Sequence, residues 1–424
     1  MRAMKDSGIP WIGEIPVEWQ VHPARYAFSE IRTKNTDGSV TNALKFYNGT
    51  IVPKANFDAE SDDYVADTIT NYTIVQPDTI MINGLNLNYD LKSLRIGLVK
   101  ETGVITSAYL ALWPDSNRIL PRFATYLFKG YETKMAFHNM GAGIRKTLGF
   151  KEFKQQPILI PVIQEQQHIV DFLDEKSAQV DAVMEQTRAS IEEYKKLKQS
   201  IITEAVTKGI RPNRPMKDSR IDWIKEIPVE WNSIHPKALF SQRKERAAVG
   251  ERQLTASQQF GVVFQDEYME KTGAKVVTVE KDFDILKHVE KGDFVISMRS
   301  FQGGLEYSEN TGSISSAYVM LIPNLKYVFP RFFRWLLKSA VYINALQSTS
   351  NMVRDGQAMR YSNFAQVRLY TVPLEEQKQI ADYLDKECDT IDSLIQRKEA
   401  FLSEMESYKK SLIFEYVTGK KDAV

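Results

Sequence analysis

"MKDSGIPWIGEIPVEW" occupies residues 4–19, and "MKDSRIDWIKEIPVEW" occupies residues 216–231. Thirteen of these 16 positions are identical, and the offset of 212 is half the length of the 424-residue chain. A long repeat at such an offset makes an internal duplication the first hypothesis about the fold.

The rest of the chain repeats in the same order. "GVITSAYLAL" (103–112) matches "GSISSAYVML" (312–321), and "PRFATYLFKG" (121–130) matches "PRFFRWLLKS" (330–339). Two further pairs are "PVIQEQQHIVDFLDEKSAQVD" (161–181) with "VPLEEQKQIADYLDKECDTID" (372–392), and "EAVTKG" (204–209) with "EYVTGK" (415–420). The sequence therefore predicts one duplicated unit, and two copies are too few for a solenoid.

The composition is that of an ordinary globular protein. The chain has 43% hydrophobic and 11% aromatic residues, and it lacks the apolar run of about 18 residues that a membrane-spanning helix needs. The N-terminus lacks the apolar segment of a signal peptide. The single cysteine, Cys388, excludes an internal disulfide and a thiolate metal cluster, and we interpret it as a small residue near a helix seam. Together these features predict a cytoplasmic protein.

The net charge of +1 is unevenly distributed. Residues 164–207 contain 5 Lys or Arg and 9 Asp or Glu, and residues 375–418 contain 6 and 11. The remainder of the chain therefore carries a net charge of +10. A basic remainder suits domains that contact phosphate groups, although a solvated basic surface without a partner would give the same charge.

The first part of each repeat combines short strands with a helix. Short apolar runs bounded by turn residues predict buried strands at 78–82, 109–113, 157–161, 293–298 and 317–323. Residues 121–137 and 330–346 begin with proline, which is favoured at the first helical position, so each range predicts one helix. We therefore expect an α+β domain in each repeat.

The second part of each repeat predicts a long helix, at about 164–207 and about 375–418. In both ranges apolar residues recur in steps of four and three, without an interrupting Gly or Pro. Such a period of about 3.5 residues is typical of a coiled coil. The steps place Val183 and Leu197 in the seam of the first helix, and Phe401 and Tyr408 in the seam of the second.

The chain order is domain, helix, domain, helix. The first helix ends at the linker "KGIRPNRP" (208–215), beside the start of the second domain, and the second helix begins where that domain ends. Helices that pack together under this connectivity run antiparallel. The predicted fold is α+β, with two tandem globular domains (1–160 and 213–372) and two helical regions (161–212 and 373–424). The long helices of these regions form an antiparallel coiled coil, and the whole is pseudo-two-fold symmetric.

Internal two-fold symmetry suits a target that has a two-fold axis of its own, and duplex DNA is such a target. The two repeats share almost no identity between residues 32–75 and 243–290. Domains that differ there would read different half-sites. We therefore expect a bipartite, asymmetric DNA sequence as the ligand, with the helices setting the spacer between its halves.

These features resemble the specificity (S) subunit of type I restriction–modification systems, the HsdS family. The resemblance rests on the doubled opening motif, on "TSAYL" (106–110) and "SSAYV" (315–319), on the helix entries "IPVIQEQQHIVDFLD" (160–174) and "VPLEEQKQIADYLD" (372–385), and on the closing "EAVTKG" and "EYVTG". Each motif is weak alone. Together they occur twice, in the family's order, over essentially the whole chain.

The resemblance implies two target-recognition domains that bind one bipartite double-stranded DNA sequence. It implies a scaffold for two DNA methyltransferase subunits and, in the full complex, for restriction subunits with motor and nuclease activity. It also implies that this chain binds no cofactor and performs no chemistry of its own. S-adenosylmethionine, ATP and Mg²⁺ are then expected on the partner subunits.

The residues point the same way. The sequence contains neither the GxxxxGK[ST] nor the GxGxxG phosphate-binding pattern, and its five histidines lack the spacing of metal ligands. The carboxylates of residues 170–185 recur at helical spacing. This spacing favours a solvated helix face over an acid–base pair. We therefore predict neither a catalytic residue nor a metal ligand.

Polar loops with cations and amides are the candidate DNA contacts, because Lys and Arg bind phosphates while Asn, Gln and Arg can read base edges. These loops are residues 32–35, 83–88 and 138–147 in the first domain, and 242–246, 298–304 and 348–361 in the second. The residues expected to contact DNA are Arg32, Lys34, Asn83, Asn86, Asn88, Arg145, Lys146, Arg243, Lys244, Arg246, Arg299, Gln302, Arg354, Gln357 and Arg360. For each of them the alternative is a solvated surface side chain.

Three other functions stay open at this point. The chain is alternatively the specificity subunit of a related restriction class, a methyltransferase that acts alone, or a coiled-coil scaffold that binds no nucleic acid. The lack of cofactor-binding patterns speaks against the methyltransferase. The opening motifs also leave two roles for Trp11, Trp19, Trp223 and Trp231. They either stack on bases or, as we expect from the neighbouring prolines, anchor each domain near the far end of the opposite helix.

Overall fold

A computed structural model describes residues 2–47, 49–54, 69–88, 94–138, 140, 146–257, 259–279, 285–296, 305–349 and 360–423. The chain divides into two compact units. Unit 1 comprises Met1–Arg188 and Glu399–Val424, and unit 2 comprises Ala189–Lys398. Each unit therefore combines one α+β domain with part of both long helices, so the compact units do not follow the four regions in chain order.

Unit 1 contains a four-stranded antiparallel sheet in the order β4-β11-β8-β9 and the ribbons β1–β2, β3–β12, β5–β6 and β7–β10. Its elements are β1 (Met4–Asp6), β2 (Glu14–Pro16), β3 (Gln20–Pro23), η1 (Ala24–Tyr26), β4 (Phe28–Glu30), β5 (Leu44–Tyr47), β6 (Thr50–Pro53), β7 (Thr73–Val75), β8 (Ile80–Ile82), β9 (Ile96–Leu98), β10 (Gly103–Ile105), β11 (Leu110–Pro114), α2 (Pro121–Thr133), α3 (Phe150–Phe153), β12 (Pro157–Ile160) and the first part of α4 (Ile163–Lys208).

Unit 2 repeats this topology strand for strand, with the sheet β16-β23-β20-β21 and the ribbons β13–β14, β15–β24, β17–β18 and β19–β22. Its elements after α4 are β13 (Met216–Ile221), β14 (Ile224–Pro228), β15 (Asn232–Ile234), α5 (Pro236–Leu239), β16 (Phe240–Arg243), β17 (Leu254–Ser257), β18 (Gly261–Phe264), α6 (Gln265–Thr272), β19 (Lys287–Val289), β20 (Phe294–Ile296), β21 (Leu305–Tyr307), β22 (Gly312–Ile314), β23 (Val319–Pro323), α7 (Pro330–Lys338), α8 (Ala340–Ser348), α9 (Tyr361–Gln366), β24 (Leu369–Thr371) and the first part of α10 (Leu374–Val417). The predicted duplication is confirmed.

The central strands are buried on both faces of the sheet. In β8, Ile80 and Ile82 belong to the larger core of unit 1, while Met81 belongs to a smaller core that also contains Val75. Successive side chains of a strand point to opposite faces, so a continuous apolar run fills two cores at once. In unit 2 the middle residue of β20, Val295, faces the smaller core in the same way.

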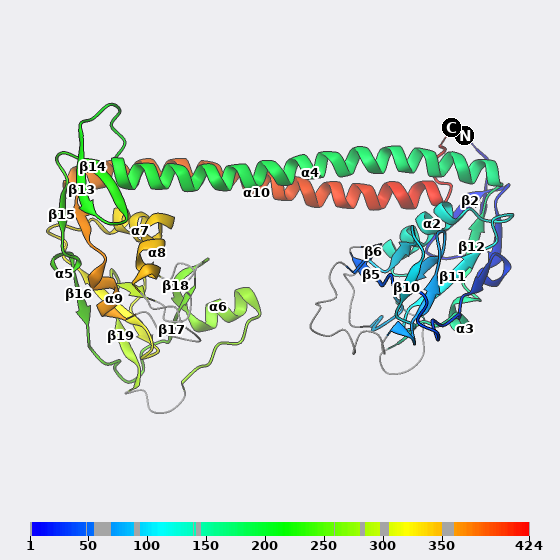
Figure 1. Cartoon of the computed structure of the whole chain (residues 1–424), viewed down its shortest axis with the longest axis horizontal. Helices are drawn as coiled ribbons and strands as arrows, with labels where there is room; N and C mark the ends of the chain where they lie inside the picture. Colours follow the sequence, from blue (N-terminus) through cyan, green and yellow to red (C-terminus); the bar gives the residue numbers. More distant parts are fainter. Residues whose placement is uncertain are drawn as a thin grey trace. The chain divides into compact units, whose positions relative to one another are not determined.

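In unit 1, α2 lies between the sheet and the end of α10 (Figure 1). A Cβ atom on Gly130 would lie 2.7 Å from Cγ2 of Val417, so the glycine lets α2 and α10 approach closely. Phe172 of α4 and Tyr416 of α10 stack beside this contact, with ring centroids 4.3 Å apart. The larger core of unit 1 is therefore closed by both long helices.

The single helix predicted over 330–346 is wrong, because α7 ends at Lys338 and α8 begins at Ala340. Ser339 between them is buried and extended, with φ −66° and ψ 142°. Its hydroxyl donates a hydrogen bond to the Leu336 carbonyl oxygen (2.7 Å). Serine side chains that bond to nearby backbone compete with helical hydrogen bonds, which explains the break.

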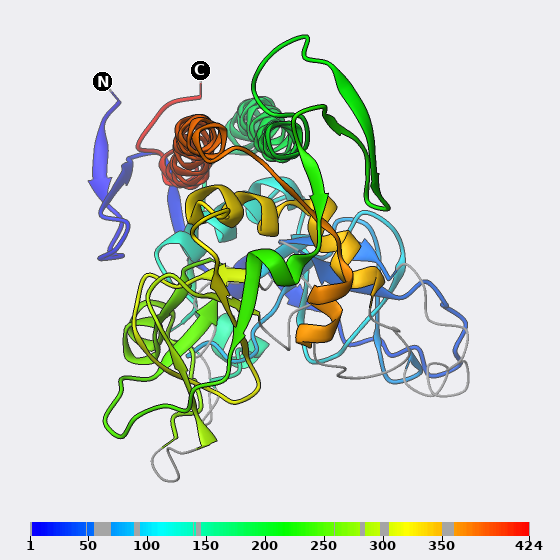
Figure 2. The same ribbon diagram turned by 90° about the vertical axis from the view of Figure 1, so that its left-hand side faces the viewer.

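The long helices predicted over about 164–207 and 375–418 are observed as α4 and α10, and they pack antiparallel within each unit. In unit 1, Lys409 binds Asp181 at 2.6 Å. In unit 2, Lys198 binds Asp392 at 2.6 Å. Figure 2, viewed along the helices, shows the two side by side. The antiparallel coiled coil of the predicted fold is therefore confirmed.

Every second predicted seam position is wrong by one residue. Val183 and Leu197 are 41% and 47% exposed, whereas Met184 and Ile191 are each 5% exposed. In α10 the buried Cys388 lies in the seam, one residue after Glu387, the position that steps of four and three from Ile380 predict. An alternation that begins with a step of four residues has the same average period as one that begins with a step of three residues. The spacing alone therefore does not decide which apolar residues face the partner helix.

The repeated opening motif anchors each unit to the helix that ends in it. Trp19 and Trp231 are buried. A Cβ atom on Gly419, just after α10, would lie 3.2 Å from Cζ2 of Trp19. A Cβ atom on Gly209, just after α4, would lie 3.5 Å from Cζ2 of Trp231. The expected anchoring by these tryptophans is confirmed.

The other two tryptophans of the motif also pack internally. Trp11 meets Tyr131 edge-on, with ring centroids 4.7 Å apart, and Trp223 meets Tyr342 at 5.5 Å. The indole N–H of Trp223 donates to the Arg368 carbonyl oxygen (2.9 Å). The structure thus uses all four tryptophans of the two motifs for packing within the units.

Candidate nucleic-acid interface

The sheet of unit 1 brings two candidate loops to one edge. Strand β11 runs antiparallel to both of its neighbours, β4 and β8. Both neighbours therefore end at the edge where β11 begins. Segment 32–35 follows β4 and segment 83–88 follows β8. Adjacent strands are about 4.8 Å apart, so the two segments leave the sheet roughly 10 Å from each other.

Unit 2 repeats this arrangement. Strand β23 runs antiparallel to both β16 and β20, so Lys244 and Arg246 follow β16 at the corresponding edge. The segment after β20, which contains candidate loop 298–304, lies outside the described residues. Arg246 pairs with Lys287 of β19 in an antiparallel bridge, as Lys34 pairs with Thr73 of β7. Lys34 and Arg246 therefore occupy equivalent positions.

The third candidate loop of unit 1 packs against the second. The N–H of Leu148 donates to the Gly84 carbonyl oxygen (3.0 Å), and the N–H of Leu87 donates to that of Lys146 (3.3 Å). A Cβ atom on residue 84 would lie 2.7 Å from the Leu148 carbonyl oxygen, so only glycine permits this approach. Segment 83–88 and the end of segment 138–147 therefore form one surface.

A buried arginine braces this surface from below. Arg95 is fully buried, and its Nη1 donates to the carbonyl oxygens of Asn83 (2.9 Å) and Leu85 (2.7 Å). Its backbone N–H donates to Oε1 of Glu132 (2.6 Å). Sequence reasoning missed Arg95, because an arginine before an apolar strand cannot be told from a surface cation. Its role follows only from the fold.

Glu132 is held in an unusual environment under the same loop. Burial raises the pKa of Glu132 to about 7, against the opposing effects of the Arg95 N–H and of the positive charges of Arg95, Lys129 and Lys410. Burial also lowers the pKa of Lys129. Since the Glu132 carboxylate accepts the backbone N–H of Arg95, it supports the loop.

The two cations of segment 32–35 differ in freedom. The Arg32 side chain is 79% exposed and pairs with Glu30 at 2.6 Å. The Lys34 ammonium donates to the Asn71 carbonyl oxygen (2.9 Å) and to Oγ of Ser107 (2.5 Å). The ammonium of Lys34 is therefore held in place at the sheet edge, whereas Arg32 reaches into solvent.

The amides of segment 83–88 also differ. The side-chain Oδ1 of Asn83 accepts the N–H of Leu85 (3.2 Å), which uses this amide to shape the loop. Asn86 and Asn88 are exposed, and Asn86 has a left-handed backbone with φ 53°. Lys146 is partly buried, with φ 38°. The exposed Asn86 is therefore better placed for base edges than Asn83.

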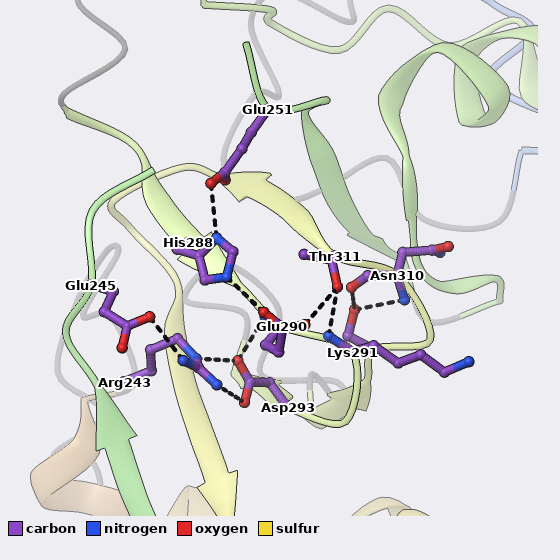
Figure 3. A network of polar contacts seen from close by, with 10 residues as sticks. Arg243, Glu245, Glu251, His288, Glu290, Lys291, Asp293, Asn310 and Thr311 are labelled. Atoms are coloured by element: carbon purple, nitrogen blue, oxygen red, sulfur yellow. Dashed lines mark hydrogen bonds and ion pairs between the residues drawn. The ribbon is translucent and has the colours of Figure 1, made fainter. Parts of the chain in front are cut away.

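In unit 2, Arg243 turns inward. Its side chain is 12% exposed, with Nε 2.6 Å from Oδ2 of Asp293 and Nη1 2.9 Å from Oε2 of Glu245 (Figure 3). The hydrogen bond to Asp293 raises the pKa of Arg243 further. A DNA contact by Arg243 would require breaking this pair. Lys244 and Arg246, which are exposed, are therefore better candidates for a DNA contact in this segment than Arg243.

The remaining candidates are mostly outside the described part of the chain. Arg360 is exposed at the start of α9, where its backbone N–H donates to Oδ1 of Asn363 (3.0 Å). The candidates outside the described residues are Arg145, Arg299, Gln302, Arg354 and Gln357.

Within the described ranges, no three His, Cys, Asp or Glu side chains gather into a group that would hold a metal ion. Among the helices described, none has the length and hydropathy to cross a membrane.

Known proteins resemble this chain in sequence. Residues 93–193 match the type I restriction modification DNA specificity domain. The type I restriction enzyme MjaX specificity subunit of Methanocaldococcus jannaschii is 22% identical over 432 residues, which cover 96% of this chain and 95% of that protein. The chain is thus similar over nearly its whole length to a specificity subunit of a type I restriction enzyme, and residues 93–193 match the DNA specificity domain of such systems.

Two solved structures share the fold over nearly the whole chain. A structure from work on complex assembly and conformational transition of the type I R-M system matches with a TM-score of 0.68 at 14% identity, covering 96% of this chain and 99% of its own. The HsdS subunit from Thermoanaerobacter tengcongensis matches with a TM-score of 0.50 at 14% identity, covering 96% and 98%. The likeness therefore extends over both repeats and both helical regions.

Proposed function

We propose that this chain recognises one asymmetric, bipartite sequence in duplex DNA, with one half-site read by each unit. The observation that carries the proposal is the repeated sheet edge. Both units direct segments rich in cations and amides from the same edge of the same sheet, yet these segments differ in sequence between the units. Two sheets of the same topology whose edge segments differ in sequence suit the recognition of two half-sites that also differ in sequence.

The described side chains suggest a division of labour in the DNA contact. Lys34 and Arg246 occupy equivalent positions in the two units, which suits phosphate contacts common to both half-sites. Asn86 and Asn88 project from a loop braced by Arg95, and asparagine can bind adenine through two hydrogen bonds. A braced loop loses little conformational entropy on binding, so its contacts contribute more fully to affinity.

In this proposal α4 and α10 serve as a ruler and a scaffold. They set the number of unspecified base pairs between the half-sites. They also present partly exposed apolar side chains, among them Val183, Leu197, Phe401 and Tyr408, to partner proteins. The partners proposed are two DNA methyltransferase subunits and, in the full complex, restriction subunits with motor and nuclease activity.

The chain itself performs no chemistry in this proposal. S-adenosylmethionine, ATP and Mg²⁺ belong to the partner subunits, since the sequence lacks the glycine-rich patterns that cradle such cofactors. Calorimetry of the purified chain with S-adenosylmethionine is expected to show no binding. Binding by the chain alone would instead favour a methyltransferase.

The DNA proposal is tested by binding measurements on the chain with its methyltransferase subunits. A duplex that carries the sequence methylated in the host genome is expected to bind far more tightly than a scrambled duplex. Binding is expected to weaken steeply with salt, by about 10³-fold or more between about 50 and 200 mM if six or more phosphates are contacted. Binding without salt dependence, or an unchanged host methylation pattern after deletion of the gene, would contradict it.

A further inference from the structure

A histidine of unit 2 links two parts of the chain that are distant in sequence. Nδ1 of His288, in β19, lies 2.9 Å from Oε1 of Glu251, and Nε2 lies 3.0 Å from Oε2 of Glu290 (Figure 3). The His288 side chain is 16% exposed. Both ring nitrogens therefore face a carboxylate at hydrogen-bond distance, in a largely buried position.

With both carboxylates ionised, this geometry favours a protonated ring. A neutral imidazole has one N–H donor and one acceptor nitrogen, whereas an ionised carboxylate only accepts. The contacts with Glu251 and Glu290 are both hydrogen bonds only when His288 carries two N–H groups. In the neutral ring, one of the two contacts would join acceptor to acceptor and would be repulsive.

The electrostatics favour the protonated ring. Burial lowers the pKa of His288, but the hydrogen bonds and charges of Glu290 and Glu251 raise it more, so the net pKa lies above 6.5. The hydrogen bond from His288 lowers the pKa of Glu290 in turn. Because the pKa of His288 is raised by folding, the stabilisation is complete below about pH 6.5 and is lost as pH rises through the folded-state pKa.

The surroundings of the ring hold further charged groups. Beyond Glu290 lie Arg243 and its partners Asp293 and Glu245, and Oδ2 of Asp293 accepts the Glu290 N–H (3.0 Å). Lys291 extends away from the ring in Figure 3. The adjacent strand β22 places an uncharged residue, Ser313, opposite His288. Among the charged groups described, the two that bond to the ring are thus both anionic.

The histidine holds the segment that carries Arg246. Its backbone N–H donates to the Glu245 carbonyl oxygen (3.1 Å), and its ring binds Glu251, so residues 245–251 are fixed at both ends. Oε1 of Glu251 also accepts the Ala248 N–H (3.0 Å) within that segment. The cation proposed to meet DNA phosphate therefore sits in a segment whose far end the His288 ring holds through Glu251.

We propose that protonated His288 is a positioning residue for DNA recognition by unit 2. By joining Glu251 to Glu290, it holds residues 245–251 so that Arg246 meets the DNA. Unit 1 carries Ile74 at the equivalent strand position, so this dependence belongs to the half-site of unit 2 alone. The inference rests on the proposed function of the chain as a DNA specificity subunit.

The test is a pH profile of binding by the full chain with its methyltransferase subunits. Fluorescein-labelled duplexes carry either the recognised sequence or that sequence with the half-site of unit 2 scrambled, at constant ionic strength from about pH 6 to about pH 9. Affinity for the recognised duplex is expected to fall by about threefold to tenfold as His288 loses its proton. Affinity for the scrambled duplex is expected to show no such step.

Variants separate His288 from other titrating groups. His288→Gln is expected to bind at all pH values as the wild type does at high pH, and His288→Arg, which keeps the charge, is expected to retain affinity at high pH. His235→Gln, at an exposed histidine of the same unit, is the matched control and should keep the wild-type profile. Thermal unfolding at pH 6 checks that each variant folds. If His288→Gln does not fold, the NMR titration of the five histidines replaces it, since the pKa of one histidine must match the binding midpoint.

The outcomes distinguish the role of His288 from the proposed function of the chain in DNA recognition. Specific, salt-dependent binding that is independent of pH, or that keeps its full pH step in His288→Gln, would overturn the role of His288 and leave DNA specificity intact. Equal affinity for recognised and scrambled duplexes at every pH would instead contradict the proposed function itself.

Discussion

At the scale of single residues, two buried glutamines join the long helices to the domains beside them. Nε2 of Gln166 donates to the carbonyl oxygens of Arg118 and Pro161 (2.9 Å each), and its Oε1 accepts the Leu120 N–H (2.8 Å). Gln377 makes the three equivalent contacts in unit 2. A buried amide that satisfies three backbone groups fixes where each helix begins relative to its own domain.

Replacing Gln166 by leucine should destabilise unit 1 by about 2–4 kcal/mol, because two carbonyl oxygens and one N–H lose their partner in a buried site. The matched control is Gln167→Leu, at the exposed neighbouring position, where the change should stay within about 0.5 kcal/mol. Urea denaturation followed by tryptophan fluorescence measures both. Equal losses for the two variants would contradict the role of Gln166.

Glu132 predicts a pH dependence of stability with a definite sign. Because burial raises its pKa to about 7, the folded state holds a proton that the unfolded state releases above about pH 4.5. The contribution of this group to stability therefore falls as pH rises from about 4.5 to about 7. Glu132→Gln removes the titrating group, so calorimetric Tm values of the variant should decline less than wild-type values across this range. Parallel profiles would show that the carboxyl does not titrate there.

At the scale of elements, local patterns predicted the long helices and five of the strands, but not the other strands or the contacts between distant segments. The apolar run at 78–82 suffices to predict β8, because a strand buried on both faces needs only apolar residues. The residues of α4 that contact α10 depend on which face of the helix meets its partner. A 3.5-residue period is compatible with two sets of such residues, so it does not decide between them. His288 and Glu251 are 37 residues apart, so only the fold brings them together. The same holds for Arg95 beneath its loop.

The seam assignment can be tested with adjacent residues of α4. Met184→Ala should destabilise the chain by about 2–4 kcal/mol, because it removes a buried side chain from the helix–helix contact. Val183→Ala, one position earlier and 41% exposed, should cost less than about 1 kcal/mol. Chemical denaturation compares the two. A larger loss at Val183 would restore the seam predicted from the sequence.

At the scale of the whole molecule, the proposal makes the helices a ruler for the DNA spacer. Inserting seven residues at facing positions of α4 and α10 preserves the 3.5-residue period and lengthens each helix by about 10 Å. Since base pairs are about 3.4 Å apart, the unspecified spacer should grow by about three base pairs. Sequencing of methylated positions in cells that carry the variant measures the spacer. An unchanged spacer would show that the helices do not set it.

The central claim, that each unit reads its own half-site, is tested most directly by exchanging one domain. Residues 213–372 are replaced by the corresponding domain of another specificity subunit, and methylated positions are mapped across the host genome by single-molecule sequencing. The account predicts that one half of the methylated sequence changes while the other half and the spacer stay the same. A change in both halves, or in neither, would contradict it.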